Sequence, residues 1–221
     1  MSWTEQPIHF VDFEGSVSSG ILEYGVVTLH RGAVTGLSTR LCRAKGEVPP
    51  QDTAVHGLNA RDLVGEAPFA EAWELFAGRR EAGPLAAHYA GAENSLLKSV
   101  WPYPRSSPDF AQGGGGVAEW GPWIDSARLC AQFRPGLGTG RLEELIAGLG
   151  LQARLDQQAA GLCPPARSRF HAAPYDALAG ALLLLELGRD PAFAELSVRQ
   201  LLAYSTLDPD KRQAITQTEL F

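Results

Sequence analysis

The sequence predicts an α/β protein built on a mixed sheet of about five strands flanked by helices. Three observations support this prediction: strand-like segments open the chain, helical patterns dominate from Asp52 onward, and short apolar strands recur between the helices. Consecutive strands with short links form an antiparallel meander, whereas strands separated by helices pair in parallel. The chain has 221 residues, of which 45% are hydrophobic, so it can bury a substantial core.

The first part of the chain supplies the meander. It is rich in β-branched and aromatic residues, and Arg31-Gly32 predicts a hairpin turn. Pro49-Pro50 ends this region. The three strands are expected over residues 8–15, 21–30 and 33–42.

Helical spacing dominates the remainder of the chain, interrupted by a short buried strand at residues 85–88. The segment 174–187 is apolar on nearly every side, so we expect it to be a buried helix. No internal repeat or clear linker divides the chain. The helices are expected over residues 68–76, 93–100, 141–149, 174–187 and 193–204, and 124–133 should run from a strand end into a helix.

Two segments lack a regular pattern. Residues 101–123 are predicted to be a loop-like insertion, rich in proline and containing the run 113–116 of four glycines. Its flexibility and its Trp and Tyr content favour a lid or a docking surface for a protein partner. Residues 208–221 are expected to be a polar tail that is mobile or docks on a partner.

Composition excludes several classes of protein. Twenty-five acidic against nineteen basic residues give a net charge of −6, which does not suggest a protein that coats nucleic acid, although a nuclease that grips only a strand end stays open. Cys42, Cys130 and Cys163 form no C-x-x-C pair, so zinc and disulfides are not expected. The N-terminus resembles no signal peptide, and the longest apolar run, 177–187, is too short for a bilayer. We therefore expect a cytoplasmic protein with no membrane partner.

Two carboxylates at the end of the first strand are the first candidate for a functional site. Asp12 and Glu14 lie two residues apart and therefore share one face of a strand. Like charges this close repel, and a divalent cation such as Mg²⁺ or Mn²⁺ offsets that repulsion. The alternative is an edge strand whose acids face water, because D-x-E is common by chance.

Three more residues are candidates on weaker grounds. Asp176 lies in the first turn of the buried helix, and His171 lies in the loop before it. Glu93 follows a short strand and begins a helix. Each has a simpler interpretation: acids are favoured at helix N-termini, and a loop histidine is commonly solvated.

Several motifs occur in the order found in the DEDDh 3′–5′ exonucleases, and the chain resembles this family. The family includes the proofreading subunit of bacterial replicative DNA polymerase, ribonuclease T and oligoribonuclease. The matching motifs are Asp12-Phe13-Glu14-Gly15, Glu23-Tyr24-Gly25-Val26-Val27, His56-Gly57-Leu58, Ala87-His88 with Glu93 and Leu97, Asp125-Ser126-Ala127-Arg128-Leu129, and His171 with Asp176. The resemblance implies a ribonuclease H-like fold, an exonuclease domain over residues 1–190, and a C-terminal helix and tail, 191–221, packed on it or extending from it.

The resemblance also implies roles for individual residues. Two Mg²⁺ or Mn²⁺ ions, roughly 4 Å apart, would supply a nucleophile and offset charge on the attacking and leaving oxygens. His171 would be the general base, since imidazole accepts protons near neutral pH. The implied metal ligands are Asp12, Glu14, Glu93 and Asp176, and Glu14 is also implied to be catalytic. The residues implied to contact the terminal nucleotide are Phe13, Gly15, Ser16, His56 and Leu58.

The chain departs from the family pattern in several places. Glu93 replaces the usual Asp, Tyr89 and Ala92 replace an Asn and an aromatic residue, and Gly15-Ser16 replaces part of a Thr-Thr-Gly run. The expected partner is a single-stranded or frayed 3′ end of DNA or RNA. Two alternatives stay open: a binding or assembly module with weakened catalysis, and a phosphohydrolase acting on short oligonucleotides.

Two interpretations of single residues also stay open. Arg167 and Arg169 either meet a substrate phosphate or are solvated loop arginines. His56 either contacts the nucleotide or caps a turn.

Overall fold

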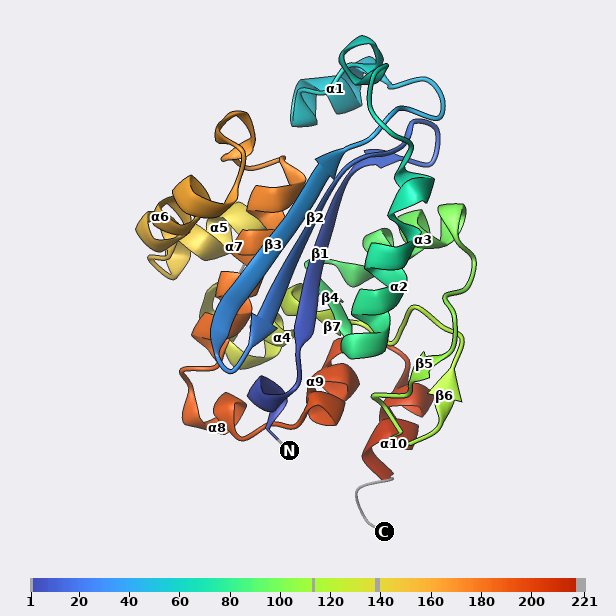
Figure 1. The fold of residues 1–221 in the computed structure, drawn as a ribbon. Helices are drawn as coiled ribbons and strands as arrows, with labels where there is room; N and C mark the ends of the chain where they lie inside the picture. The colour runs from blue at the N-terminus through green and yellow to red at the C-terminus, as the bar shows by residue number, and fades with distance from the viewer. Residues whose placement is uncertain (1, 113, 138–139, 218–221) are drawn as a thin grey trace.

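The computed structural model describes residues 2–112, 114–137 and 140–217 (Figure 1). A five-stranded sheet of order β3-β2-β1-β4-β7 forms its centre. β1, β2 and β3 pair antiparallel, and β4 and β7 continue the sheet in parallel from β1. The predicted fold class is confirmed. The strands span Ile8–Ser16 (β1), Gly20–His30 (β2), Ala33–Leu41 (β3), Leu85–Ala87 (β4) and Ile124–Asp125 (β7).

The two hairpins of the meander depend on residues that tolerate positive φ. Arg31 and Gly32 have φ of 53° and 73°, the combination that matches strand twist in a two-residue turn. Gly15 has φ of 129° at a shift in the β1–β2 register, and a Cβ there would collide with the Gly20 carbonyl. This bulge lies directly after Glu14 and precedes the hairpin turn.

Helices cover both faces of the sheet (Figure 1). α7 packs on β1 and β2, with α5 and α6 outside it, while α2 and α3 lie against the opposite face. The close packing of α7 depends on Gly180, where a Cβ would collide with the Phe10 ring. These helices span Trp73–Ala82 (α2), Ala90–Val100 (α3), Leu142–Gly148 (α5), Gln152–Leu162 (α6) and Ala173–Leu187 (α7).

The remaining elements lie around the ends of the sheet. α1 lies beyond one end, and α8 to α10 lie near the other (Figure 1). The helices span Pro50–His56 (α1), Ser126–Phe133 (α4), Pro191–Ala194 (α8), Val198–Ser205 (α9) and Pro209–Gln217 (α10). The 3₁₀ turns span Trp3–Glu5, Ala60–Leu63, Phe69–Ala72, Pro135–Leu137 and Pro165–Arg167, and a two-stranded sheet joins Ser107–Pro108 (β5) to Gly116–Val117 (β6).

The two ends of the insertion 101–123 pack against the rest of the protein. Trp120 is fully buried, and its indole N–H donates to the Trp101 carbonyl at 2.7 Å. The Trp101 ring stacks on Phe69 at 4.7 Å between centroids. Burial of these large aromatic side chains stabilises the packed ends of the insertion, and its role as a lid or a docking surface stays a prediction.

Three helix predictions were also incomplete. The segment 193–204 is two helices, because Ser197 begins α9 with a capping box that includes Gln200. α6 was not predicted. α10 occupies much of the expected tail, whose last residues, 218–221, lie outside the described part of the chain. Among the described residues, no helix is both long and apolar enough to cross a bilayer.

Candidate active site

Three carboxylates from the two ends of the chain meet at one face of the sheet. Asp12 and Glu14 project from β1, Asp176 projects from the first turn of α7, and one oxygen of each lies within 4.8 Å of the others. Gly25 pairs with Asp12 across β1 and β2, and a Cβ on Gly25 would collide with the Ala173 backbone. The bare glycine therefore lets the start of α7 approach the strand, which brings Asp176 to the β1 acids.

Glu93 joins this group from α3. β4 pairs with β1 only at His9 and Phe10, which leaves the later edge of β1 open. The Phe13 N–H at that edge donates to the Glu93 carboxylate, whose residue is 8% exposed. The negative charge of Glu93 raises the pKa of Asp12, and that of Asp176 raises the pKa of Glu93. All four predicted acids therefore lie within electrostatic reach of one another.

Burial makes this group hard to ionise. It raises the pKa of Asp12 well above its ordinary value and the pKa of both Glu14 and Glu93 to about 8. Burial also raises the pKa of Asp176 to about 7, although the His171 N–H donates to it at 3.0 Å. Neighbouring carboxylates add to the shift at each position. Near neutral pH, such a group holds protons or a cation.

The unpaired oxygens of the group fit a divalent cation. Asp176 Oδ1 and Glu93 Oε2 are buried and accept no hydrogen bond from the described residues. Buried polar atoms without a partner are uncommon in folded proteins. Several carboxylate oxygens facing one point are the donor set that Mg²⁺ and Mn²⁺ prefer.

His171 lies at the rim of the carboxylate group. Its side chain is exposed, and its backbone φ of 59° is unusual for a residue other than glycine. Its N–H donates to Asp176, and its carbonyl accepts from Arg167 Nη2 at 3.3 Å. The two hydrogen bonds hold this backbone conformation next to the acids.

A buried ion pair that the sequence analysis did not predict lies behind the acids. Arg167 Nε and Nη2 donate to the two Glu23 oxygens at 2.8 and 2.6 Å, and Glu23 is 1% exposed. Arg167 is therefore neither a solvated loop residue nor open to a phosphate, which corrects both expectations. Arg169 is exposed and donates to the His56 carbonyl at 3.0 Å. A glutamate inside the apolar β2 segment was the available signal, because a buried acid requires a partner.

His56 and Leu58 are buried near this ion pair. His56 ends α1, and its Nδ1 accepts the Leu58 N–H at 3.0 Å, as expected for a histidine that caps a turn. Its Nε2 is buried without a partner among the described residues. The Leu58 side chain packs with Leu22 and Leu63. The turn-capping interpretation accounts for one ring nitrogen and leaves the other unexplained.

The remaining residues expected to contact substrate are held by the fold in different ways. The Phe13 side chain faces away from the acids and packs edge-on to Phe69 at 5.5 Å, so only its backbone reaches the site. Gly15 forms the bulge after Glu14. Ser16 Oγ bonds the hydroxyls of Ser18 and Ser19 at 2.9 and 3.1 Å.

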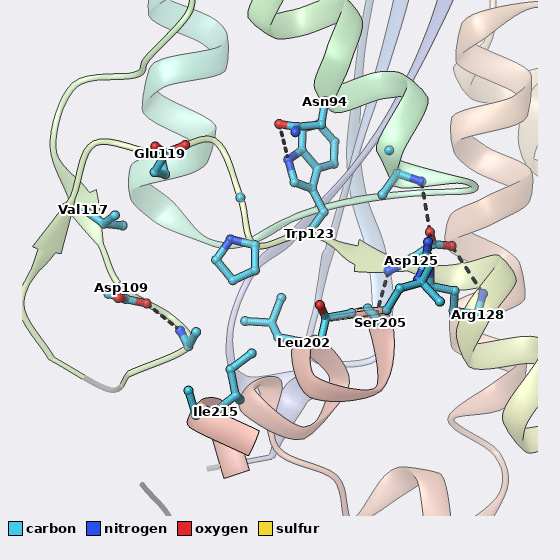
Figure 2. A pocket seen from close by; sticks show the side chains of 18 of the residues that line it. Asn94, Asp109, Val117, Glu119, Trp123, Asp125, Arg128, Leu202, Ser205 and Ile215 are labelled. Atoms are coloured by element: carbon cyan, nitrogen blue, oxygen red, sulfur yellow. Dashed lines mark hydrogen bonds and ion pairs between the residues drawn. The ribbon is translucent and has the colours of Figure 1, made fainter. Parts of the chain in front are cut away.

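A separate cavity of about 660 Å³ is lined by residues of α3, the insertion 101–123, α4, α9 and α10 (Figure 2). None of the four acids lines it. Asn94 accepts the Trp123 indole N–H there, and Asp125 accepts from the Ala90 N–H and from Arg128 (Figure 2). Asp125 therefore ties the start of α3, and with it Glu93, to the start of α4.

Sheet order and covering helices define the class: a ribonuclease H-like fold with an acidic group at one face of the sheet. No family model and no curated protein matches the sequence. Solved structures similar to the chain include several exonucleases, one of them described as a DEDDh family member, which confirms the predicted resemblance at the level of the fold.

Three of these solved structures illustrate the likeness. Exonuclease X in complex with 5′ overhanging duplex DNA has a TM-score of 0.62 at 18% identity, covering 90% of this chain and 99% of that one. The nuclease domain of 3′hExo, a DEDDh family member bound to rAMP, has a TM-score of 0.60 at 13% identity, covering 87% and 96%. Exonuclease I from Methylocaldum szegediense has a TM-score of 0.62 at 13% identity, covering 90% and 42%.

Proposed function

We propose that this chain is a metal-dependent nuclease that removes nucleotides from the 3′ ends of nucleic acids. The observation that carries the proposal is the meeting of Asp12, Glu14 and Asp176 within 4.8 Å, with Glu93 beside them. The similar structures add support, since Exonuclease X was solved with DNA and 3′hExo with rAMP.

The four acids are the residues that would hold divalent cations. Asp12, Glu14 and Asp176 would hold one, and Glu93 from α3 would help to hold a second. Mg²⁺ or Mn²⁺ bound there would supply a nucleophile at neutral pH and offset charge on the phosphate oxygens. The longer side chain of Glu93 reaches this position while accepting the Phe13 N–H.

His171 accepts the proton of the attacking water. Its ring is exposed at the rim, so the proton can pass on to solvent. The hydrogen bond from its N–H to Asp176 fixes its backbone next to the acids. Gly15 and Ser16, together with the end of α1, form the surface for the terminal nucleotide, and the buried His56 and Leu58 side chains hold that end of α1 in place.

The direct test is release of mononucleotides from a 3′-labelled single strand in Mg²⁺ or Mn²⁺. We expect Asp12→Asn to lower the rate by about a thousandfold or more, since metal-assisted charge stabilisation is worth several kcal/mol. His171→Ala should lower it by about a hundredfold or more, the usual contribution of a general base. Arg154→Lys, an exposed change on α6, is the control. Full activity in both site variants would contradict the proposal.

The departure at Glu93 supports a second candidate, a module that binds strand ends with weakened catalysis. This candidate predicts that the protein binds oligonucleotides without releasing product. Calorimetry with Mn²⁺ distinguishes it from an active nuclease, since a module that has lost its metal site binds no cation. Product ladders from long and very short DNA and RNA strands then define the substrate and test the third candidate, a phosphohydrolase of short oligonucleotides.

A further inference from the structure

Arg167 connects two segments that come from different parts of the chain. Its Nη1 donates to the His56 carbonyl at 2.8 Å, and its Nη2 donates to the His171 carbonyl at 3.3 Å. His56 ends α1, and His171 lies in the loop before α7. Neither segment belongs to the sheet.

Glu23 anchors Arg167 to the sheet itself. Both its oxygens accept from the guanidinium, and Oε2 also accepts the Ala173 N–H at 2.9 Å. Glu23 lies opposite Glu14 in the β1–β2 register, so the anchor is one strand away from the acids. One buried pair thus ties β2, the end of α1, the His171 loop and the start of α7 together.

The planar guanidinium is suited to this arrangement. It offers five N–H donors in a fixed fork, which here reach a carboxylate and two carbonyls at once. A lysine keeps the charge but donates from a single point. His171 particularly needs such support, because a positive φ in a non-glycine residue persists only where the surroundings hold it.

We propose that Arg167 is a positioning residue. We call Arg167 and its partners Glu23, His56 and His171 the Arg167 clamp. The clamp sets the spacing between the end of α1 and the His171 loop, and so holds the terminal-nucleotide surface and the proton acceptor in register with the acids. This role rests on the proposed function; the hydrogen-bonded connection itself does not.

The first experiment measures the connection without any assay of activity. Amide hydrogen exchange of Arg167→Lys should be faster at His171, whose N–H donates to Asp176, and at Leu58, whose N–H donates to His56 Nδ1. Exchange in the β1–β2 ladder should not change, and Arg154→Lys should match the wild type throughout. Unchanged protection at both amides would overturn the clamp.

The second experiment separates positioning from a loss of folded protein. We expect Arg167→Lys to lower kcat by about a hundredfold, the loss typical of a reacting group displaced by about 1 Å, and to raise KM for the oligonucleotide. Mn²⁺ affinity should stay the same. A purely structural role would lower the active fraction and leave KM unchanged, and that result would also overturn the proposal.

Two further variants complete the design. Glu23→Gln keeps an acceptor for the Ala173 N–H. It is the variant to test if Arg167→Lys does not fold. The double variant should lose little more activity than either single one, because both changes break one unit. An inactive wild type would count against the nuclease function, and the exchange measurement would still decide whether the clamp exists.

Discussion

The carboxylate group and the Arg80 side chain are both buried and ionisable, yet they differ in how completely their hydrogen bonds are made. Arg80 is 1% exposed, and its guanidinium donates to four carbonyls of residues 108 and 119–121 at 3.0 to 3.2 Å. It also lies over the Phe110 ring, 5.2 Å from its centroid. The acids instead face one another, with two oxygens unpartnered and every pKa raised.

The difference separates a structural polar cluster from a candidate functional one. A buried charge with its hydrogen bonds made can anchor a segment, as Arg80 anchors the insertion. A buried group of like charges with unpaired oxygens destabilises the fold on its own account and indicates a ligand. The same contrast holds within the site, where both Glu23 oxygens are paired, whereas Asp176 Oδ1 and Glu93 Oε2 are not.

Removing the Arg80 anchor should have the largest effect on stability. Arg80→Met leaves four carbonyls without their donor, so we expect the free energy of unfolding to fall by about 3 kcal/mol. Urea unfolding followed by Trp fluorescence measures this change, with Arg80→Lys as the milder control. Turnover per folded molecule should stay at the wild-type level, and a loss of turnover would show that the insertion reaches the site.

The carboxylate group should make the metal-free protein less stable as pH rises. The raised pKa values mean that these acids bind more protons in the folded state than in the unfolded state. Below about pH 6.5 the lowered pKa values of His9, His56 and His88 act in the opposite direction, so the decrease in stability is expected between about pH 6.5 and pH 8. Mn²⁺ should therefore raise Tm more at about pH 8 than at about pH 5.5, because protons compete with the cation. Thermal melts with and without Mn²⁺ test both statements, and a Tm that rises in EDTA between about pH 6.5 and pH 8 would contradict the first.

Neutralising one acid should stabilise the metal-free protein while it abolishes activity. Asp12→Asn removes a repulsive charge, and we expect a gain of about 1 kcal/mol near pH 8, in the range of other stabilising changes at functional sites. The pH slope should flatten, and the Mn²⁺ effect should shrink. A loss of stability would indicate that Asp12 is paired like Arg80.

Changing the length of Glu93 should have the smallest effect. Glu93→Asp keeps the charge but shortens the reach to the Phe13 N–H, so we expect a stability loss of about 1 kcal/mol or less. Glu93→Gln keeps the hydrogen bond and loses the charge, so it should keep stability and lose Mn²⁺ affinity. Retained or higher turnover in Glu93→Asp supports a working enzyme, whereas equal Mn²⁺ binding in both variants would remove Glu93 from the metal site.

Local patterns in the sequence determined the elements on which the site stands. The alternation of side chains along β1 placed Asp12 and Glu14 on one face, and Arg31-Gly32 located the second hairpin. The apolar run of α7 predicted its burial. Each of these features depends on neighbours a few residues away, which the sequence displays directly.

Tertiary structure alone decided which distant groups meet. The approach of α7 to Gly25 brings Asp176 to β1, and the open edge of that strand gives Glu93 its hydrogen bond. Packing also buried Arg167 against Glu23. Such contacts depend on how helices pack against the sheet, and side-chain spacing along the chain carries no direct record of that packing.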